Sequence, residues 1–251
     1  MTDASPTPLT VQSVAYVGLD ALLAAMPFDL CAYLHVGEQL GPQLYLRQPT
    51  LADLDPADAF RLFSTLRDLL DERPSEDLRT RIDTFDACVA VSSGPRSHGL
   101  WAAGRHDGLH DKAAATAVSV GRAIMTVCHA AESAAVASSL PVVLRVGVDT
   151  RGDSTTAEVE IDNGRTITGY GSGATQLAAV ATATIDGIAP SSKLIAADED
   201  TIDDQRVVLV LVRDDQGEST VGSALADRGP LVAAAEATLI ALGCRGSWIA
   251  P

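Results

Sequence analysis

The chain contains one short glycine-rich stretch whose composition could support ligand chemistry, at residues Gly169 to Gly173 (GYGSG). Gly169 and Gly171, followed by Ala174, fit the dinucleotide fingerprint G-x-G-x-x-A, in which a phosphate rests on a helix N-terminus. However, the preceding strand alternates in polarity, and no parallel βαβ unit surrounds it, so a dinucleotide is disfavoured. We favour a packing role for these glycines beneath the following helix. The alternative is an anion or regulatory-ligand site formed by Gly169, Gly171, Ser172 and Gly173.

A second set of candidate residues combines aromatic rings with guanidinium groups on the expected strands of the first half. These residues are Tyr33, Tyr45, Arg47, Trp101 and Arg105. Rings and guanidinium groups suit a flat or anionic ligand. The simpler interpretation is that the aromatic residues belong to the core and the arginines to the surface.

Histidine spacing gives little support for a metal site. His106 and His110 are four residues apart, which suits a metal on a helix, but the intervening Gly108 indicates a loop. His98 and His129 are isolated and are expected to be structural. We therefore predict no metal ligand.

Other chemical motifs are also missing from the sequence. The acidic run at 198–200 lacks the glycine and terminal glutamate of a calcium loop, so a solvated loop is expected. There is no nucleophile elbow and no phosphate-binding G-K-[ST] loop. We accordingly predict no catalytic residue and no cofactor.

Composition narrows the class of protein. A length of 251 residues suggests about two domains. With 18 basic and 33 acidic residues the net charge is −15, which argues against nucleic-acid binding. No signal peptide is expected, and no apolar run approaches the roughly 20 residues that span a bilayer. The four cysteines are far apart, as expected for free thiols in a cytoplasmic protein.

Periodicity predicts alternating helices and strands in the first half. Helices are expected at 11–26, 57–70 and 112–132, and strands at 29–36, 43–47, 86–92 and 99–105. The charged segment 71–84 is expected to be a surface loop or a short helix. A linker follows the last helix at about 136–140.

The second half reads as one unit repeated. Strands are expected at 142–148, 157–161 and 165–168, followed by a helix at 174–188; the glycine-rich stretch should break the last strand. A second set follows, with strands at 193–197, 206–214 and 218–226 and another helix. The helical segments LAAVATATIDGI and LVAAAEATLIAL align without a gap. Neither unit of about 50 residues could bury its apolar face alone. We therefore expect the two units to share a continuous sheet.

Two resemblances follow from these patterns. The leading helix with LDALLAAM, the strand DLCAYLHV and the segment SSGPRSHGLWAAGR resemble a GAF sensor domain. That family binds a small ligand between its sheet and the covering helix and loops; the related roadblock-type fold is the alternative. The second half, with GYGSG before an alanine-rich helix, is similar to the regulatory domain of α-isopropylmalate synthase, which binds a feedback amino acid.

The predicted fold class is α+β with two domains. Residues 1–9 form a tail, 10–135 a GAF-like antiparallel sheet with flanking helices, 141–246 a pseudo-duplicated βββα module and 247–251 a second tail. The predicted function is a non-catalytic cytoplasmic regulator or sensor that binds a small molecule, a protein partner or both. The alternatives are an enzyme whose site is assembled from distant residues, and a purely structural or scaffolding dimer.

We also predict a homodimer that forms through the first domain. The helices at 11–26 and 112–132 carry apolar residues beyond the single stripe that a sheet requires. Ala117 and Gly121 are small enough to allow two helices to approach closely. Two-fold pairing is the commonest arrangement of this kind.

Overall fold

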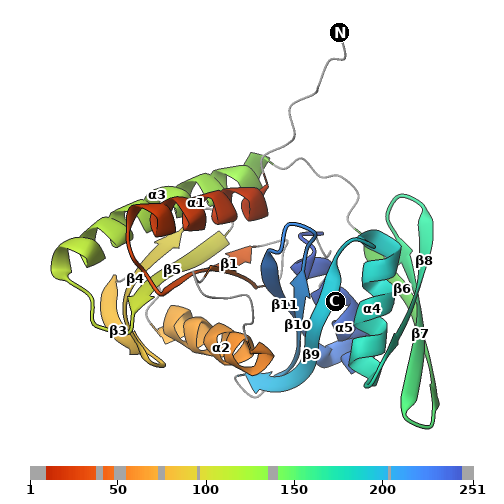
Figure 1. Ribbon diagram of the computed structural model, residues 1–251. Coiled ribbons are helices and arrows are strands. Elements are labelled where there is room, and N and C mark those ends of the chain that lie inside the picture. Colours follow the sequence, from red (N-terminus) through yellow and green to blue (C-terminus); the bar gives the residue numbers. More distant parts are fainter. Residues whose placement is uncertain are drawn as a thin grey trace.

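The computed structural model describes residues 10–37, 42–47, 55–72, 77–94, 97–134, 141–202 and 205–244. These residues form an α+β fold with a sheet of eight strands and a sheet of three (Figure 1). The α+β class expected from the sequence is confirmed. The expected tails at 1–9 and 247–251 and the expected linker at 136–140 lie outside the described residues.

The larger sheet joins strands from both halves of the chain. Its eight strands lie in the order β3-β4-β5-β1-β2-β11-β10-β9, and every neighbouring pair is antiparallel. The strands are β1 (Leu30–Gly37), β2 (Gln43–Arg47), β3 (Leu78–Ile82), β4 (Phe85–Ser93), β5 (Ser97–Arg105), β9 (Lys193–Ile202), β10 (Gln205–Arg213) and β11 (Ser219–Leu225).

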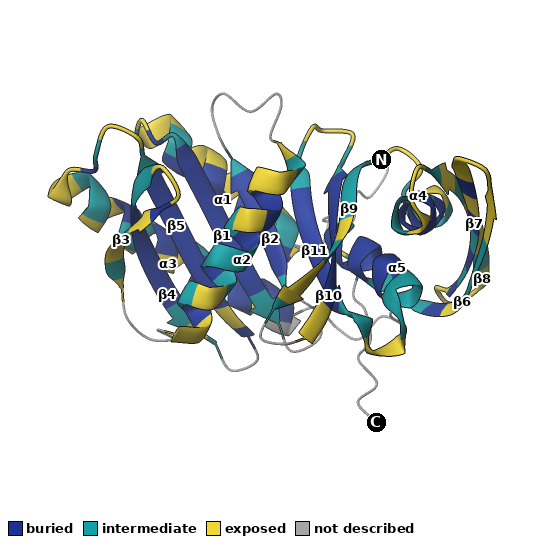
Figure 2. Ribbon diagram, turned by 90° about the horizontal axis from the view of Figure 1, so that it is seen from below, coloured by how far each residue is buried: buried dark blue, intermediate teal, exposed yellow. Residues whose placement is uncertain are grey.

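Three helices cover the first-half strands. Helix α2 (Pro56–Glu72) crosses one face, and α1 (Val11–Ala25) and α3 (Asp111–Ala134) lie side by side on the other (Figures 1 and 2). The strands therefore point alternate side chains into two cores. On β1, Ala32 and Leu34 face α2, whereas Cys31 and Tyr33 face α1 and α3. Thr10 begins α1 with a capping box, in which its side chain and that of Ser13 satisfy each other's backbone N–H groups.

The remaining strands form a separate small sheet. Strands β6 (Val142–Arg151), β7 (Ser154–Asp162) and β8 (Thr166–Gly173) are antiparallel neighbours in a three-stranded sheet. Helices α4 (Gln176–Ile188) and α5 (Pro230–Ala241) pack against each other between this sheet and the end of the larger one (Figure 1). The expectation of one sheet shared by the two units is wrong. Each unit buries its apolar face through its helix, so no strand pairing between the units is needed.

The larger sheet combines strands from both sides of the domain boundary that the sequence predicts at about residues 136–140. In β2 and β11, Tyr45 pairs with Thr220 and Leu44 pairs with Val221. Strand β10 lies one place further along, and its uninterrupted apolar run VVLVLV is buried on both faces of the sheet. Leu209 and Leu211 face α2, whereas Val208 and Val210 face α4 and α5. The division at residues 135 to 141 stays a prediction, but the two parts meet through strand hydrogen bonds.

Three local expectations are wrong. Residues 78–82, expected in a loop or short helix, form β3, because Leu78 and Ile82 face the core while Arg79 and Arg81 face outward. The acidic run at 198–200 lies within β9. Both are terminal strands of the sheet, where charged side chains remain hydrated and discourage pairing with another sheet. The glycine-rich stretch does not break its strand but forms most of β8.

Candidate functional site

The structure brings the three aromatic candidates of the first half together beneath α1 and α3. Tyr33 stacks on Tyr45 with ring centroids 6.1 Å apart, and its ring lies 6.3 Å from that of Trp101. All three side chains are buried, and burial raises the pKa of both tyrosines well above its usual range. These residues therefore fill the core, which is the simpler of the two interpretations drawn from the sequence.

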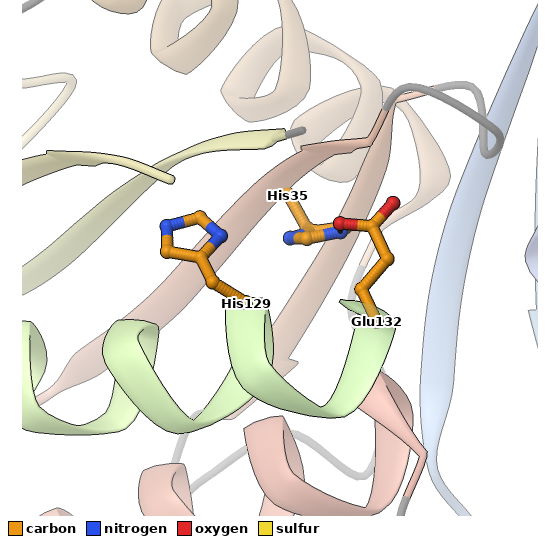
Figure 3. Close-up of side chains that lie close together, drawn as sticks. All are labelled: His35, His129 and Glu132. Atoms are coloured by element: carbon orange, nitrogen blue, oxygen red, sulfur yellow. Dashed lines mark ion pairs between the residues drawn. The ribbon is translucent and has the colours of Figure 1, made fainter. Parts of the chain in front are cut away.

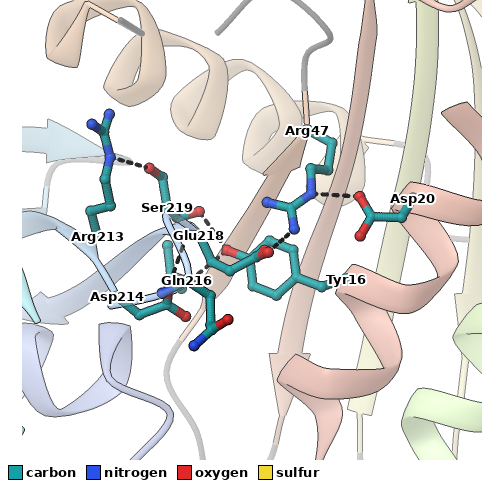
Figure 4. A network of polar contacts seen from close by, with 9 residues as sticks. Tyr16, Asp20, Arg47, Arg213, Asp214, Gln216, Glu218 and Ser219 are labelled. Carbon is teal, nitrogen blue, oxygen red and sulfur yellow. Dashed lines mark hydrogen bonds and ion pairs between the residues drawn. The ribbon is translucent and has the colours of Figure 1, made fainter. Parts of the chain in front are cut away.

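Arg47 lies at the edge of this core, in a polar network that connects the two halves (Figure 4). The Arg47 Nε donates a hydrogen bond to Asp20 of α1 at 2.7 Å. The Arg47 Nη2 forms an ion pair with Glu218, which directly precedes β11. The guanidinium also lies 4.4 Å from the centre of the Tyr16 ring. Burial raises the pKa of Glu218, although Arg47 opposes that shift. Arg47 therefore connects α1 to the segment that precedes β11. Arg105 is half-buried, and its Nε has no hydrogen-bond partner among the described residues.

Tyr16 contributes the second link between α1 and β11. Its hydroxyl donates to the Ser219 carbonyl at 2.6 Å and lies 2.8 Å from the Thr220 hydroxyl. Tyr16→Phe should therefore lower the free energy of unfolding by about 1–3 kcal/mol, because the Ser219 carbonyl loses its donor. Urea denaturation measures this loss. Tyr170→Phe is the matched control: Tyr170 is exposed on β8, and its substitution should change stability by less than about 0.5 kcal/mol.

The glycine-rich candidates lie in the small sheet, away from the aromatic cluster. A Cβ on Gly169 would lie 1.9 Å from the Ala183 carbonyl oxygen, and one on Gly171 would lie 2.3 Å from the Ala183 nitrogen. Gly173 likewise lies against the first turn of α4, whereas Ser172 is exposed on the opposite face. This close approach of backbone to backbone is the packing role favoured above.

A buried polar cluster lies where the C-terminal part of α3 crosses the end of β1 (Figure 3). It consists of His35 from β1 and of His129 and Glu132 from α3. One potential ligand atom from each residue lies within 4.8 Å of the others. His35 Nε2 is 3.3 Å from a Glu132 carboxylate oxygen, and the two imidazole rings are 6.0 Å apart. This is the one such grouping found among the described residues.

Two hydroxyl groups hold the imidazole rings of this cluster in place. The Tyr33 hydroxyl lies 2.9 Å from His35 Nδ1, and the Ser97 hydroxyl is hydrogen-bonded to His129 Nδ1. Burial, followed by the neighbouring His35, lowers the pKa of His129 and favours its neutral form. Burial alone would raise the pKa of Glu132, but His35, Ser97 and His129 together lower it overall. The cluster therefore places a carboxylate beside at least one neutral imidazole.

Sequence reasoning missed two members of this cluster and assigned the third a structural role. His35 lies in a strand whose neighbours are apolar, and His129 and Glu132 are one helical turn apart. A histidine inside an apolar strand and a His-x-x-Glu pair on a helix were the available signals. His35 and His129 are 94 residues apart, so no local sequence pattern connects the two signals. By contrast, His106 and His110 lie in an exposed loop, as predicted.

The chain matches no known protein family. No curated protein sequence matches it either. The four cysteines are free, and Cys31, Cys88 and Cys128 are buried. Burial raises the pKa of the Cys88 thiol to about 11 and that of Cys128 to about 12, so neither is a nucleophile at neutral pH.

The outer face of the α1–α3 layer is almost free of charge. Val17 on α1 and Val127 on α3 are two of the four large apolar side chains that are exposed in the described residues. Up to residue 132, the last in α3 whose side chain the structure describes, the other exposed positions beyond the first turn are Ala115, Thr116, Ser119, Arg122, Ala123, Thr126 and Ala130. Arg122 is the one charge among them, and it pairs with Asp77 at 2.7 Å.

The sequence misplaced the small residues of α3. Ala117 is buried, and a Cβ on Gly121 would lie 2.5 Å from the Trp101 ring. Both residues therefore face the sheet, and neither is available to a second copy of the helix. α3 places its glycine where the large indole ring fills the space beneath it.

One helix segment, Asp111–Glu132, is long and apolar enough to cross a membrane by length and composition alone. Only 28% of its most apolar 18-residue window is buried. The helix packs against α1 and the sheet on one side, so the remaining side is the uncharged face described above.

Proposed function

We propose that this chain is a non-catalytic regulatory protein that works as a homodimer, with the two copies pairing through the outer faces of α1 and α3. The observation that carries the proposal is the exposed, uncharged surface around Val17 and Val127. A helix on a sheet needs one apolar stripe, and these helices carry a second. An exposed apolar surface of this kind marks an interaction site.

Charge on this face does not oppose a second copy as its occupant. Each copy carries a net charge of −15, so two copies repel each other over most of their surface. On the outer face of α1 and α3, Asp20 is already paired with Arg47, and Arg122 with Asp77. A contact there joins two nearly neutral surfaces. A two-fold axis would place the same patch on both partners.

Val127→Arg should split the dimer without unfolding the protein. The side chain of Val127 is 45% exposed, so arginine can be accommodated, but two guanidinium groups would face each other across a two-fold axis. Light scattering at micromolar concentration should give a mass near twice 26.0 kDa for the unmodified chain and near 26.0 kDa for the variant.

Leu144→Arg is the matched control for this test. Leu144 is 53% exposed on β6 of the small sheet, away from the α1–α3 layer, and its substitution should leave the dimer intact. A monomeric unmodified chain would refute the homodimer. Binding of that monomer to neutral lipid vesicles, with loss of binding in Val127→Arg, would assign the face to a membrane surface instead.

We also propose a fold family for the first half and an internal duplication for the second half. The order α1-β1-β2-α2-β3-β4-β5-α3 supports a GAF-like or roadblock-like first domain. In the second half, each group of three antiparallel strands is followed by a helix, which supports a duplicated βββα module. Helices α4 and α5 each carry a buried threonine whose hydroxyl donates a hydrogen bond to the carbonyl four residues earlier. These bonds run from Thr184 to Val180 and from Thr238 to Ala234.

At aligned positions, α4 and α5 each pack closely against a glycine of the preceding strand. A Cβ on Gly222 would lie 2.2 Å from the Ala237 carbonyl oxygen, as one on Gly169 would lie against Ala183. Ala183 and Ala237 occupy equivalent positions in the gapless alignment of the two helices. This repeated contact supports a common origin for the two units. For the two βββα units we infer a regulatory role comparable to that of the regulatory domain of α-isopropylmalate synthase, which binds an amino acid.

A further inference from the structure

The last turns of α3 are attached to the sheet largely through polar side chains. Beyond Met125, the buried positions in the described part of this helix are Cys128, His129, Ala131 and Glu132. The two apolar members of this set are small, so they bury little area. His129 and Glu132 contact strand residues instead. The attachment of these turns therefore depends on the charge state of buried polar groups.

The cluster consists of two separate contacts. His35 Nε2 forms an ion pair with a Glu132 carboxylate oxygen at 3.3 Å, and the Ser97 hydroxyl is hydrogen-bonded to His129 Nδ1. Figure 3 shows that Nδ1 is the His129 nitrogen on the side of His35 and Glu132, whereas Nε2 lies on the far side of the ring. The three side chains therefore do not converge on one metal ion. His129 Nε2 is buried and has no hydrogen-bond partner among the described residues.

Backbone atoms close tightly over these side chains. A Cβ on Gly37, at the end of β1, would lie 2.1 Å from a Glu132 carboxylate oxygen, and one on Gly94 would lie 2.9 Å from the His129 ring. His129 itself is only 6% exposed. A proton added to its Nε2 would place a positive charge in a dry position without a hydrogen-bonded acceptor, which is costly.

The neighbours of His129 act in both directions on its protonation. Burial is the largest cause of its lowered pKa, and the neighbouring imidazoles of His35 on β1 and His98 on β5 lower that pKa further. Glu132 on the same helix and the backbone of Ser92 on β4 favour the charged form. The opposing groups prevail, so the pKa of His129 lies below the ordinary value for histidine.

We propose that His129 is an acid-sensitive latch, whose protonation releases the last turns of α3 from the sheet. In the released form the imidazole is hydrated and titrates at about pH 6.5. Below that pH the released form binds more protons than the attached form, so each further pH unit favours release by up to about tenfold. This continues until the pH reaches the lower pKa of the attached form.

Other charged groups near these turns respond later or are already paired. The pKa of Glu132 is lowered from the ordinary value of 4.5, so the stabilisation from its carboxylate is lost only in stronger acid. Helix α1, which also packs on α3, carries one charged residue, Asp20, and this residue is paired with Arg47. His129 therefore responds to acid before Glu132 does.

The latch should also control the dimer, a consequence that rests on the homodimer proposed above. Val127 and Ala130 lie on the exposed side of the turns whose buried side carries His129 and Glu132. Release of these turns would distort one end of the α1–α3 face, so the dimer should dissociate in acid. Net charge alone predicts the reverse, because the charge of −15 falls toward zero as the pH approaches the pI of about 4.5.

Hydrogen exchange of the full chain tests the latch directly. Between about pH 7.5 and about pH 5.5, the protection factors of backbone amides in 126–134 should fall by up to about tenfold, whereas those in 111–121 should not change. His129→Gln cannot take up the proton and should abolish this pH dependence. The matched control is His110→Gln, which removes an exposed histidine just before α3 and should leave the pH dependence intact.

Two results would overturn the latch. One is protection that falls equally along the whole chain, which indicates general unfolding in acid; the other is a local response that persists in His129→Gln. If His129→Gln does not fold, the pKa of His129 in the unmodified chain decides. Read by NMR from the ring protons, this pKa should lie below the ordinary value for histidine, and a higher pKa would also overturn the proposal.

Light scattering separates the latch from the homodimer. The mass of the unmodified chain should fall from near twice 26.0 kDa toward 26.0 kDa over the same pH range, whereas His129→Gln should stay dimeric. A chain that is already monomeric at neutral pH would refute the homodimer, and hydrogen exchange alone would then decide the latch. A dimer that persists in acid while 126–134 loses protection would show that the latch does not control the interface.

Discussion

Gly169→Ala should lower the free energy of unfolding by about 2–4 kcal/mol, although it adds only a methyl group. The new Cβ would lie 1.9 Å from the Ala183 carbonyl oxygen and 2.8 Å from the Gly187 nitrogen. Both are backbone atoms of α4, so no side chain can rotate away to make room. The helix would have to move off the small sheet and thereby expose Val159, Ala179 and Ala183.

Gly147→Ala is the matched control for this prediction. Gly147 lies on β6 of the same small sheet, and the nearest atom to its added Cβ would be the Glu158 carbonyl oxygen at 3.9 Å. Its substitution should be neutral or slightly stabilising, because alanine loses less backbone freedom on folding. Urea denaturation of both variants provides the comparison. Similar stabilities for the two variants would show that α4 does not approach β8 as closely as the structure indicates.

A fragment of residues 139–251 should aggregate, although it contains both βββα units. In the full chain, Val207, Leu209 and Leu211 are buried in the core beneath α2, which belongs to the first half. Removing the first half exposes these side chains, each of which contributes about 1.5–3 kcal/mol when fully buried. It also exposes the β11 edge that pairs with β2. The sequence alone suggested one cooperative domain, because the contribution of α2 could not be seen.

Co-expression with residues 1–138 as a separate chain is the control for the fragment. The partner restores α2 and β2, so both pieces should become soluble and co-purify. Size-exclusion chromatography and thermal unfolding monitored by circular dichroism distinguish the outcomes. A soluble monomeric fragment with one sharp transition near the melting temperature of the full chain would show that the second half is an independent domain.

Local patterns gave most of the helices and strands, because each depends on spacing within a short window. The alternation in 157–161 and the helical spacing in 177–188 predicted β7 and α4 correctly. Errors occurred where charge or glycine obscured the pattern. The strands β3 and β9 carry charged residues on their exposed sides, and β8 carries glycines that only a covering helix explains. The pairing of β2 with β11 has no local signal, since register depends on the folded sheet.

The candidate site was harder to predict for the same reason. Tyr33, Tyr45 and Trp101 were grouped because each lies on an expected strand, and the structure pairs β1 with both β2 and β5. The polar cluster depends on where α3 crosses β1, and neither the helix nor the strand contains that information. Gly121 shows the same limit: its small size was visible in the sequence, but only the position of Trp101 shows which way it faces.

The pairing of β2 with β11 also has a consequence for the newly made chain. β2 ends at Arg47 and β11 begins at Ser219, so about two thirds of the chain separates these neighbouring strands. At a synthesis rate of roughly 5–20 residues per second, β11 follows β2 out of the ribosome after roughly 10–35 seconds. For that time the free edge of β2 has no partner, and closing the sheet requires a slow long-range contact. We therefore expect the nascent chain to need a chaperone more than the finished protein does.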